Sequence, residues 1–161
     1  MAGVRRFEDL ICWQKAREFC KTVYRLTHGE RFAADTSLVD QSRRSSVSVM
    51  ANIAEGFGRG TQGEFVTFLG YSLGSLNETL SHLCVAYDQE VITRQEFRDT
   101  YAQGLEVRRV TLGFISGMRQ PGGGVKYSRK QVDFAEWVWQ LHEKVTGRPR
   151  PPMFRKQKPE D

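Results

Sequence analysis

Two arginines, an amide and a carboxylate lie within one stretch whose other residues are typical of a buried helix. Arg43 and Arg44 are followed, on the same helical run, by Asn52 and Glu55. Charge in a packing surface is costly unless it is paired with an opposite charge or contacts a polar partner. The stretch therefore predicts either an internal polar network that fixes an assembly or a surface that contacts a polar ligand.

Both hypotheses fit the two arginines. They are adjacent, so their side chains project about 100° apart on a helix, and one can turn to an acid while the other faces outward. In the network hypothesis Gln41, Asn52 and Glu55 are structural. We then expect Asn52 and Glu55 to be at least half buried and hydrogen-bonded, and one of the two arginines to pair with an acid. In the ligand hypothesis Arg43 and Arg44 bind nucleic acid.

Other cations recur at the spacing of one helical turn. Arg17, Lys21 and Arg25 share one face of the first helical segment and can follow a phosphate backbone. The alternative is the solvated face of an amphipathic helix. Arg59 lies in the glycine-rich turn 56–60 and is a further exposed charge for a phosphate. That turn is not a dinucleotide-binding loop, because it joins two helices instead of following a strand.

Positive charge is concentrated near the C-terminus. Residues 1–120 hold 15 Lys/Arg and 14 Asp/Glu, whereas residues 121–161 hold 9 and 5. Such a cationic arm on a near-neutral body suits a polyanionic partner, and a solvated tail is the alternative. The residues of this arm that we expect to bind nucleic acid are Arg148, Arg150, Arg155 and Lys156.

The sequence does not indicate metal, cofactor or nucleophilic chemistry. The histidines, His28, His82 and His142, are scattered over three segments, with no CxxC or Glu-x-x-His motif. No serine has the motif of an activated nucleophile. No apolar run approaches the ~20 residues of a membrane helix, and the N-terminus lacks the apolar core of a signal peptide. We therefore expect a cytoplasmic protein that is not an enzyme and has no membrane partner.

The cysteines agree with that location. Cys12, Cys20 and Cys84 occupy half-apolar positions on helical segments. Their odd number and the lack of a paired spacing predict free, buried thiols in a reducing compartment.

Helical periodicity predicts an all-α fold. Apolar residues recur every three or four positions over four long segments and a short one, at about 8–28, 38–55, 62–89, 94–119 and 129–145. Hydroxyl and acid residues at capping-box spacing precede three of these segments: Ser37-x-x-Asp40, Thr61-x-x-Glu64 and Thr93-x-x-Glu96. Four long helices with short connections favour an antiparallel up-down four-helix bundle.

Three regions follow from this pattern. The bundle occupies residues 1–120, a Gly-rich linker with a short Trp-containing helix occupies 121–146, and a basic, Pro-rich tail that is disordered unless bound occupies 147–161. Whether the short helix docks on its own bundle or on a partner stays open.

The apolar residues also predict how the helices pack. The clearest core stripe runs along 62–89, and Gly70 and Gly74 within it predict close approach of a neighbouring helix. Segment 38–55 is expected to turn its Val39, Val47, Met50, Ile53 and Ala54 side inward, and segment 94–119 its Phe97, Tyr101, Leu105, Leu112, Ile115 and Met118 side. Further apolar residues lie off the main stripes: Phe19, Phe57, Val107, Val110 and Phe114. A second apolar side suggests an oligomer or a docked fifth helix.

With the helices placed, an ordered set of short motifs resembles a known family. The matching pieces are Phe7-Glu8-Asp9-Leu10 with Trp13-Gln14-Lys15-Ala16, Leu38-Val39-Asp40-Gln41-Ser42-Arg43-Arg44-Ser45, Asn52-Ile53-Ala54-Glu55-Gly56-Phe57-Gly58-Arg59, Glu64-Phe65-x-x-Phe68-Leu69, and Gly74-Ser75-Leu76-Asn77-Glu78. Together they resemble the four-helix bundle proteins encoded in intervening sequences of bacterial large-subunit ribosomal RNA genes. This family is related to the accessory variability determinant (Avd) of diversity-generating retroelements, a helical pentamer that binds nucleic acid and a reverse transcriptase.

The resemblance implies a four-helix protomer, a homopentamer, no catalysis and a role linked to RNA. Residues beyond Pro121 lie outside it and suggest a dedicated partner. Two function classes remain. One is a nucleic-acid-binding assembly that serves a reverse transcriptase or another RNA-handling enzyme, and the other is a protein-interaction scaffold without nucleic acid.

Overall fold

The chain folds into helices wherever the computed structural model describes it, over residues 6–118. These residues belong to one compact unit, Met1–Pro121. Among them are no strands, and the elements in chain order are η1 (Phe7–Asp9), α1 (Ile11–Leu26), α2 (Glu30–Ala33), α3 (Thr36–Gly58), α4 (Gln62–Asp88) and α5 (Arg94–Met118). The predicted all-α class is confirmed for this part of the chain. The predicted helix 129–145 and the basic tail lie outside the described residues.

The side chains that begin α4 and α5 are those that the sequence predicts. Thr61 Oγ1 accepts a hydrogen bond from the Glu64 amide. Thr93 Oγ1 accepts from the Glu96 amide, while the Glu96 carboxylate accepts from the Thr93 amide at 2.7 Å. This reciprocal pairing satisfies backbone donors that a helix otherwise leaves unpaired at its first turn.

The start of α3 differs from the prediction. Asp35 is the N-cap, and its carboxylate accepts from the Leu38 amide at 3.0 Å. Ser37 therefore lies inside the first turn and does not cap the helix. The four-residue helix α2 was not predicted either, because it is too short to show an apolar period.

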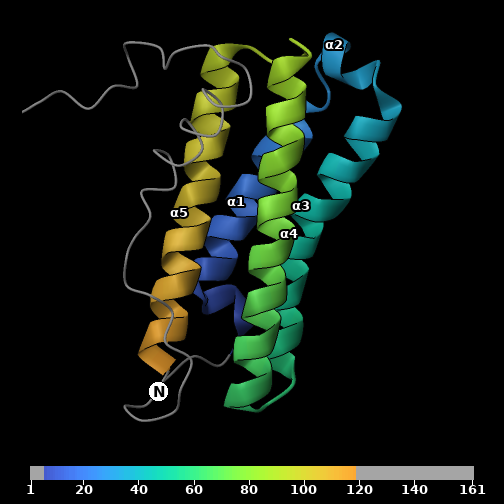
Figure 1. Cartoon of the computed structure of the whole chain (residues 1–161). Coiled ribbons are helices and arrows are strands. Elements are labelled where there is room, and N and C mark those ends of the chain that lie inside the picture. Colours follow the sequence, from blue (N-terminus) through green and yellow to red (C-terminus); the bar gives the residue numbers. More distant parts are fainter. Residues whose placement is uncertain (1–5, 119–161) are drawn as a thin grey trace, which may run out of the picture. The chain divides into compact units, whose positions relative to one another are not determined.

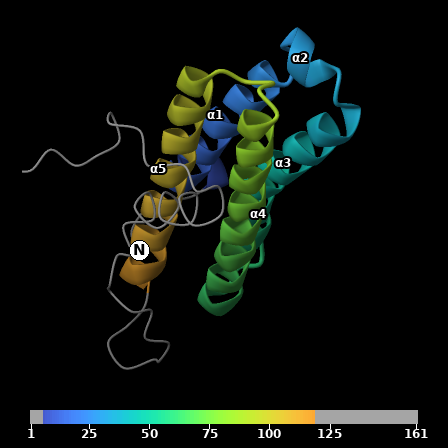
Figure 2. The same ribbon diagram turned by 45° about the horizontal axis from the view of Figure 1, so that its top comes forward.

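The four long helices lie side by side, and α2 lies at one end with the connection from α1 to α3 (Figures 1 and 2). Contacts join α1 to α3, α3 to α4, α4 to α5 and α5 back to α1. Helices α3 and α4 run in opposite directions. Ser72 on α4 bonds to Val49 on α3, and Thr79, which comes later on α4, bonds to Ser45, which comes earlier on α3.

The core of α4 is the leucine stripe that its period predicts. The fully buried leucines on this helix are Leu69, Leu76 and Leu83. Around them α1 contributes Phe19 and Val23, which are also fully buried.

Two other core faces were predicted only in part: Ile53, Ile115 and Met118 are buried as expected, but most of the other residues on these faces differ. On α3, Val47 is 40% exposed, while serines at 42, 45 and 46 face the core with Val49 and Ile53. On α5 the buried face is Thr100, Gly104, Val107, Thr111, Ile115 and Met118. Val107 and Phe19, expected off the main stripes, are therefore core residues, and Tyr101, Leu105 and Leu112 are only partly buried.

The glycines that allow close packing are also different from those expected. Gly70 and Gly74 are exposed, and a Cβ at either would meet nothing within 4 Å. A Cβ on Gly56 would lie 2.5 Å from Phe68 Cβ, and one on Gly104 would lie 2.7 Å from Leu80 Cδ2. Close approach therefore occurs between α3 and α4 at Gly56, and between α4 and α5 at Gly104.

Candidate nucleic-acid interface

Arg43 is held in place near the junction of α1, α2 and α3. Its Nε donates to Thr27 Oγ1 at 2.8 Å, and its guanidinium carbon lies 5.0 Å from the centre of the Tyr24 ring. Thr27 is buried and its hydroxyl donates to the Tyr24 carbonyl at 2.8 Å. The half-buried arginine therefore bridges the start of α3 to the end of α1.

The outer edge of this guanidinium remains available. No described residue accepts a hydrogen bond from Arg43 Nη1 or Nη2, and neither nitrogen is among the buried polar atoms that lack a partner. Neither nitrogen is therefore both buried and unpaired, and their N–H groups remain for a further acceptor. A planar guanidinium presented edge-on matches two oxygens of a phosphate or a carboxylate.

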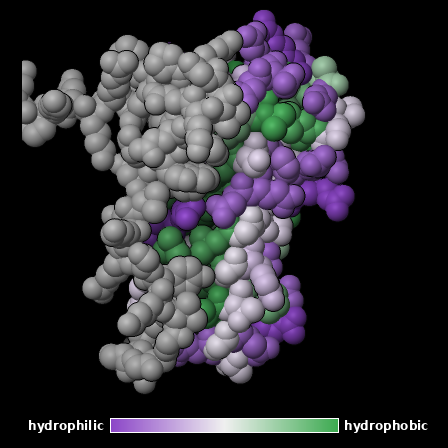
Figure 3. Space-filling model, in the orientation of Figure 1, coloured by the Kyte–Doolittle hydropathy of each residue, from purple (hydrophilic) through white to green (hydrophobic). Residues whose placement is uncertain are grey.

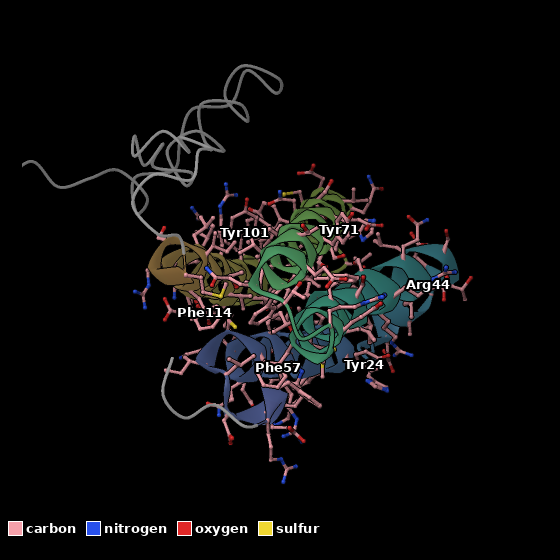
Figure 4. The ribbon with its side chains drawn as sticks, turned by 90° about the horizontal axis from the view of Figure 1, so that it is seen from below. Tyr24, Arg44, Phe57, Tyr71, Tyr101 and Phe114 are labelled. Atoms are coloured by element: carbon pink, nitrogen blue, oxygen red, sulfur yellow. The ribbon has the colours of Figure 1, made fainter. Side chains whose placement is uncertain are left out.

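Further cations surround the Arg43 site. Lys21 and Arg25 are exposed on α1, Arg31 is exposed on α2, and Arg44 is exposed on α3. Figure 4 places Tyr24 and Arg44 on the same side of the bundle, away from Phe114. Residues 15–44 hold seven Lys/Arg and four Asp/Glu, whereas residues 55–88 hold one Lys/Arg and four Asp/Glu. The potential around Arg43 thus favours anions more than the surface of α4 does.

The predicted stripe on α1 is exposed along its length. Arg17 lies over the Trp13 ring at 5.6 Å, and Lys21 forms an ion pair with Glu18 at 3.2 Å. Arg17, Lys21 and Arg25 are all exposed. An exposed ion pair of this kind contributes at most about 1 kcal/mol, so an incoming phosphate can replace it.

Arg59 lies in a different environment. Its Nη2 is 2.6 Å from Glu55 Oε1, and its guanidinium carbon lies 5.1 Å from the centre of the Phe68 ring. One carboxylate thus already occupies the edge of this guanidinium, in the more acidic part of the chain. The predicted residues Arg148, Arg150, Arg155 and Lys156 lie outside the described residues.

The expected network of Gln41, Asn52 and Glu55 is not one network. Gln41 donates to Ser37 Oγ at 3.3 Å, and Asn52 donates to the Ser48 carbonyl at 2.9 Å. Asn52 is more than half buried, as expected. Glu55 is hydrogen-bonded as expected, to Arg59 one turn later, but the expectation that it is at least half buried is wrong, because its side chain is 52% exposed.

The expected pairing of an arginine with an acid is confirmed at Arg44. Its Nη1 lies 3.5 Å from Asp40 Oδ2, one turn earlier on α3. Both side chains are exposed, so this pair does not stabilise a buried charge. Arg43, the better buried of the two arginines, uses a hydroxyl and an aromatic ring instead.

The polar network that the structure does contain lies between α3 and α4. Thr79 Oγ1 donates to Ser45 Oγ at 2.9 Å, Ser45 Oγ lies 3.3 Å from His82 Nδ1, and Ser75 Oγ donates to Ser48 Oγ at 2.9 Å. Ser45 and Thr79 are buried. The signal in the sequence was the run of serines on α3, which share one face at helical spacing. Because these hydroxyls join two helices, we assign them to packing.

Burial also sets the chemistry of the thiols. Desolvation raises the pKa of Cys12 and of Cys84 to about 11. A thiol with such a pKa is protonated at neutral pH and is a poor nucleophile. Cys12, Cys20 and Cys84 are free, as predicted, and Cys84 is only partly buried. Within residues 6–118, no group of three or more His, Cys, Asp or Glu could hold a metal ion.

The surface of α4 contrasts with the basic end. In Figure 3, purple hydrophilic atoms lie at the upper end near α2 beside a green hydrophobic patch, while pale atoms follow the lower part of α4. Exposed small residues there include Gly63, Gly70 and Gly74, and Tyr71 beside them is 57% exposed. None of the helices in residues 6–118 is long and apolar enough to cross a bilayer.

A family model described as "23S rRNA-intervening sequence protein" matches residues 8–113. The match spans α1 to most of α5 and includes Arg43 together with its contacts Tyr24 and Thr27. The chain belongs to this family. The resemblance seen in the motifs is thereby confirmed.

A solved structure agrees in fold. A protein of unknown function from the S23 ribosomal protein family of Bacteroides thetaiotaomicron superposes with a TM-score of 0.60 at 24% sequence identity. The alignment covers 65% of this chain and 98% of that one. At this identity the likeness shows the helical fold alone. A comparison with curated proteins finds no match.

Proposed function

We propose that this 23S rRNA-intervening sequence protein is a non-catalytic, nucleic-acid-binding subunit that serves an RNA-handling enzyme, such as a reverse transcriptase. The observation that carries the proposal is Arg43, which is fixed by Thr27 and Tyr24 while its outer nitrogens have no acceptor among the described residues. Lys21, Arg25 and Arg44 supply further charge on the same side. The link of the family to a ribosomal RNA gene makes structured RNA the first ligand to test.

The protomer in this proposal is an antiparallel up-down four-helix bundle. Support comes from the order of contacts between neighbouring helices. Thr27 and Cys20 of α1 meet Arg43 and Ser46 of α3, and the rings of Phe65 and Tyr87 of α4 meet those of Phe114 and Phe97 of α5. In each pair one helix ascends while the other descends.

RNA binding is expected to be strongly salt-dependent. About five phosphate contacts give a slope of about −3.5 to −4.5 in a plot of log affinity against log salt, so affinity falls by roughly 100- to 500-fold between ~50 and ~200 mM salt. Combining Arg25→Gln, Arg43→Gln and Arg44→Gln removes up to three contacts and reduces the slope by about 2 to 3. Fluorescence anisotropy with a labelled structured RNA measures both quantities.

The matched control replaces Arg98 and Arg109 with Gln. Both are exposed cations on α5 that already pair with acids, Asp99 and Glu106. The control is expected to leave the slope unchanged. Deleting residues 147–161 lowers affinity and slope if the basic tail takes part. Full-length protein that ignores RNA at ~50–100 mM salt would instead support a scaffold without nucleic acid.

The alternative function, a protein-interaction scaffold, is favoured by the exposed surface of α4. Gly70 and Gly74 let another helix approach its backbone, and Tyr71 offers an aromatic anchor. We propose that a second copy of the chain occupies this surface and that the assembly is a homopentamer. This self-association is compatible with RNA binding, because Tyr71 and Arg43 lie on different helices.

Replacing Gly74 with Arg is expected to break the assembly. The side chain would stand where a neighbouring copy approaches, yet its Cβ meets nothing within 4 Å in the protomer. Gly74→Ala should keep the assembly and stabilise the helix by up to about 1 kcal/mol. Light scattering after size exclusion should give several times 18.5 kDa for the wild type and for Gly74→Ala. A wild type that is monomeric at micromolar concentration contradicts the pentamer.

A further inference from the structure

The exposed aromatic ring of Tyr24 lies among cations, and a surface that binds only phosphates does not need such a ring. It is an aromatic residue, 37% exposed, in the middle of the basic side of α1, and Arg43 lies over its ring. We propose that Tyr24 and Arg43 together bind one unpaired nucleotide, the base stacked on the exposed part of the Tyr24 ring and the phosphate on the outer edge of the Arg43 guanidinium. This inference rests on the proposed function and names its ligand class as single-stranded RNA.

Arg43 is preorganised for this role. Its Nε is bonded to Thr27 Oγ1, and the Thr27 hydroxyl is bonded in turn to the Tyr24 carbonyl. The two bonds and the stacking on Tyr24 restrict the long side chain before any ligand arrives. Binding then loses less side-chain entropy than it would at a free surface arginine. The remaining N–H groups can donate to two phosphate oxygens at once.

Tyr24 supplies the contact that distinguishes an unpaired base. Nucleobases in a continuous duplex are stacked on each other, so an aromatic side chain cannot reach their faces. Bases in single strands and loops can turn out and stack on tyrosine, and arginine adds to such a stack. Lys21 lies one turn before Tyr24, and Arg25 directly follows Tyr24. These two cations can bind the phosphates on either side of the bound nucleotide.

The molecule contains a similar pair that serves as an internal comparison. Arg59 lies over Phe68, and Phe68 packs against the exposed Tyr71. There, however, Glu55 occupies the guanidinium at 2.6 Å, and the surrounding residues 55–88 are acidic. A phosphate at this second pair would have to displace a carboxylate against an unfavourable potential. We therefore assign the nucleotide to Tyr24 and Arg43 alone.

The experiment compares a labelled single-stranded oligoribonucleotide with a blunt duplex of the same length, bound to full-length protein at ~100 mM salt. Tyr24→Ala is expected to lower affinity for the single strand by about tenfold, the typical effect of losing one stacked base. Affinity for the duplex should fall much less than affinity for the single strand, and the salt slope stays unchanged because no charge is lost. Tyr24→Phe keeps the ring and should bind like the wild type. Arg43→Lys keeps the charge but loses the paired donors, and should weaken single-strand binding several-fold.

The matched control is Arg59→Lys, which alters the cation of the second pair and should leave both affinities unchanged. An oligoribonucleotide with abasic sites in place of bases should bind the wild type as weakly as the normal strand binds Tyr24→Ala, and the variant should lose nothing further. Melting followed by circular dichroism confirms that Tyr24→Ala remains folded.

The outcomes separate this inference from the proposed function. If Tyr24→Ala binds the single strand as tightly as the wild type does while the steep salt slope persists, the stacking site is wrong and the phosphate surface stands. If the wild type prefers the duplex, the ligand class is wrong. If the wild type binds neither RNA, both proposals are wrong.

Discussion

Gly56→Ala is expected to destabilise the protein by about 2 kcal/mol or more, the upper range for adding a methyl group to a packed site. The new Cβ would lie 2.5 Å from Phe68 Cβ and 3.0 Å from Phe65 Cδ2. Phe68 Cβ is attached directly to the backbone, so no rotation of a side chain relieves the clash. The start of α4 must instead move away from the end of α3. Urea denaturation followed by circular dichroism measures the loss.

The other glycines give graded controls for this result. At Gly104 the nearest atom is Leu80 Cδ2, the end of a flexible side chain, so Gly104→Ala should cost less than Gly56→Ala. Gly70→Ala meets nothing within 4 Å and should stabilise the helix by up to about 1 kcal/mol. Equal effects at the three positions would contradict the packing described for Gly56.

Helix ends were predicted well where local chemistry decides them. Thr61 with Glu64, and Thr93 with Glu96, satisfy the first turn of their own helices, so four consecutive residues contain the whole signal. Asp35 was missed because two hydroxyl residues follow it, and the sequence alone gives several candidates for the N-cap. The leucine stripe of α4 was also predicted, because its period is long and uninterrupted.

The core faces of α3 and α5 were predicted only in part, for a physical reason. Hydropathy treats serine and threonine as polar, but in a helix their hydroxyls can bond back to a carbonyl one turn earlier. Ser45 donates to the Ser42 carbonyl, Ser46 to that of Arg43, and Thr111 to that of Val107. Their polarity is thus satisfied within the helix, and their small size lets neighbouring helices pack closely.

The candidate site was predicted only in part. Arg43 was predicted as a candidate because it is a charged residue on a helix that has a buried face. Its partners Thr27 and Tyr24 could not be assigned, because a contact between residues 16 positions apart depends on how α1 docks on α3. The fixed geometry of the arginine, which carries the proposed function, is therefore information that the fold adds to the sequence.

Phe19→Ala is expected to cost about 3–5 kcal/mol, the range for removing a buried phenylalanine. Phe19 is fully buried on α1, although its place off the main stripe of the sequence suggested a second, outer side. The loss leaves a cavity among close-packed side chains. Ile11→Ala, on the same helix but 62% exposed, should change stability by less than about 0.5 kcal/mol. Similar losses at both positions would contradict the assigned core.

A double-mutant cycle tests where that cavity lies. A Cβ on Gly104 would come 3.3 Å from Phe19 Cε2 as well as 2.7 Å from Leu80 Cδ2. In the Phe19→Ala background the leucine can move into the vacated space, so Gly104→Ala should cost less there than in the wild type. We expect a coupling energy of about 1 kcal/mol or more between the two changes, as for residues that share a cavity. Strict additivity would mean that α1 and α5 do not meet at this level of the bundle.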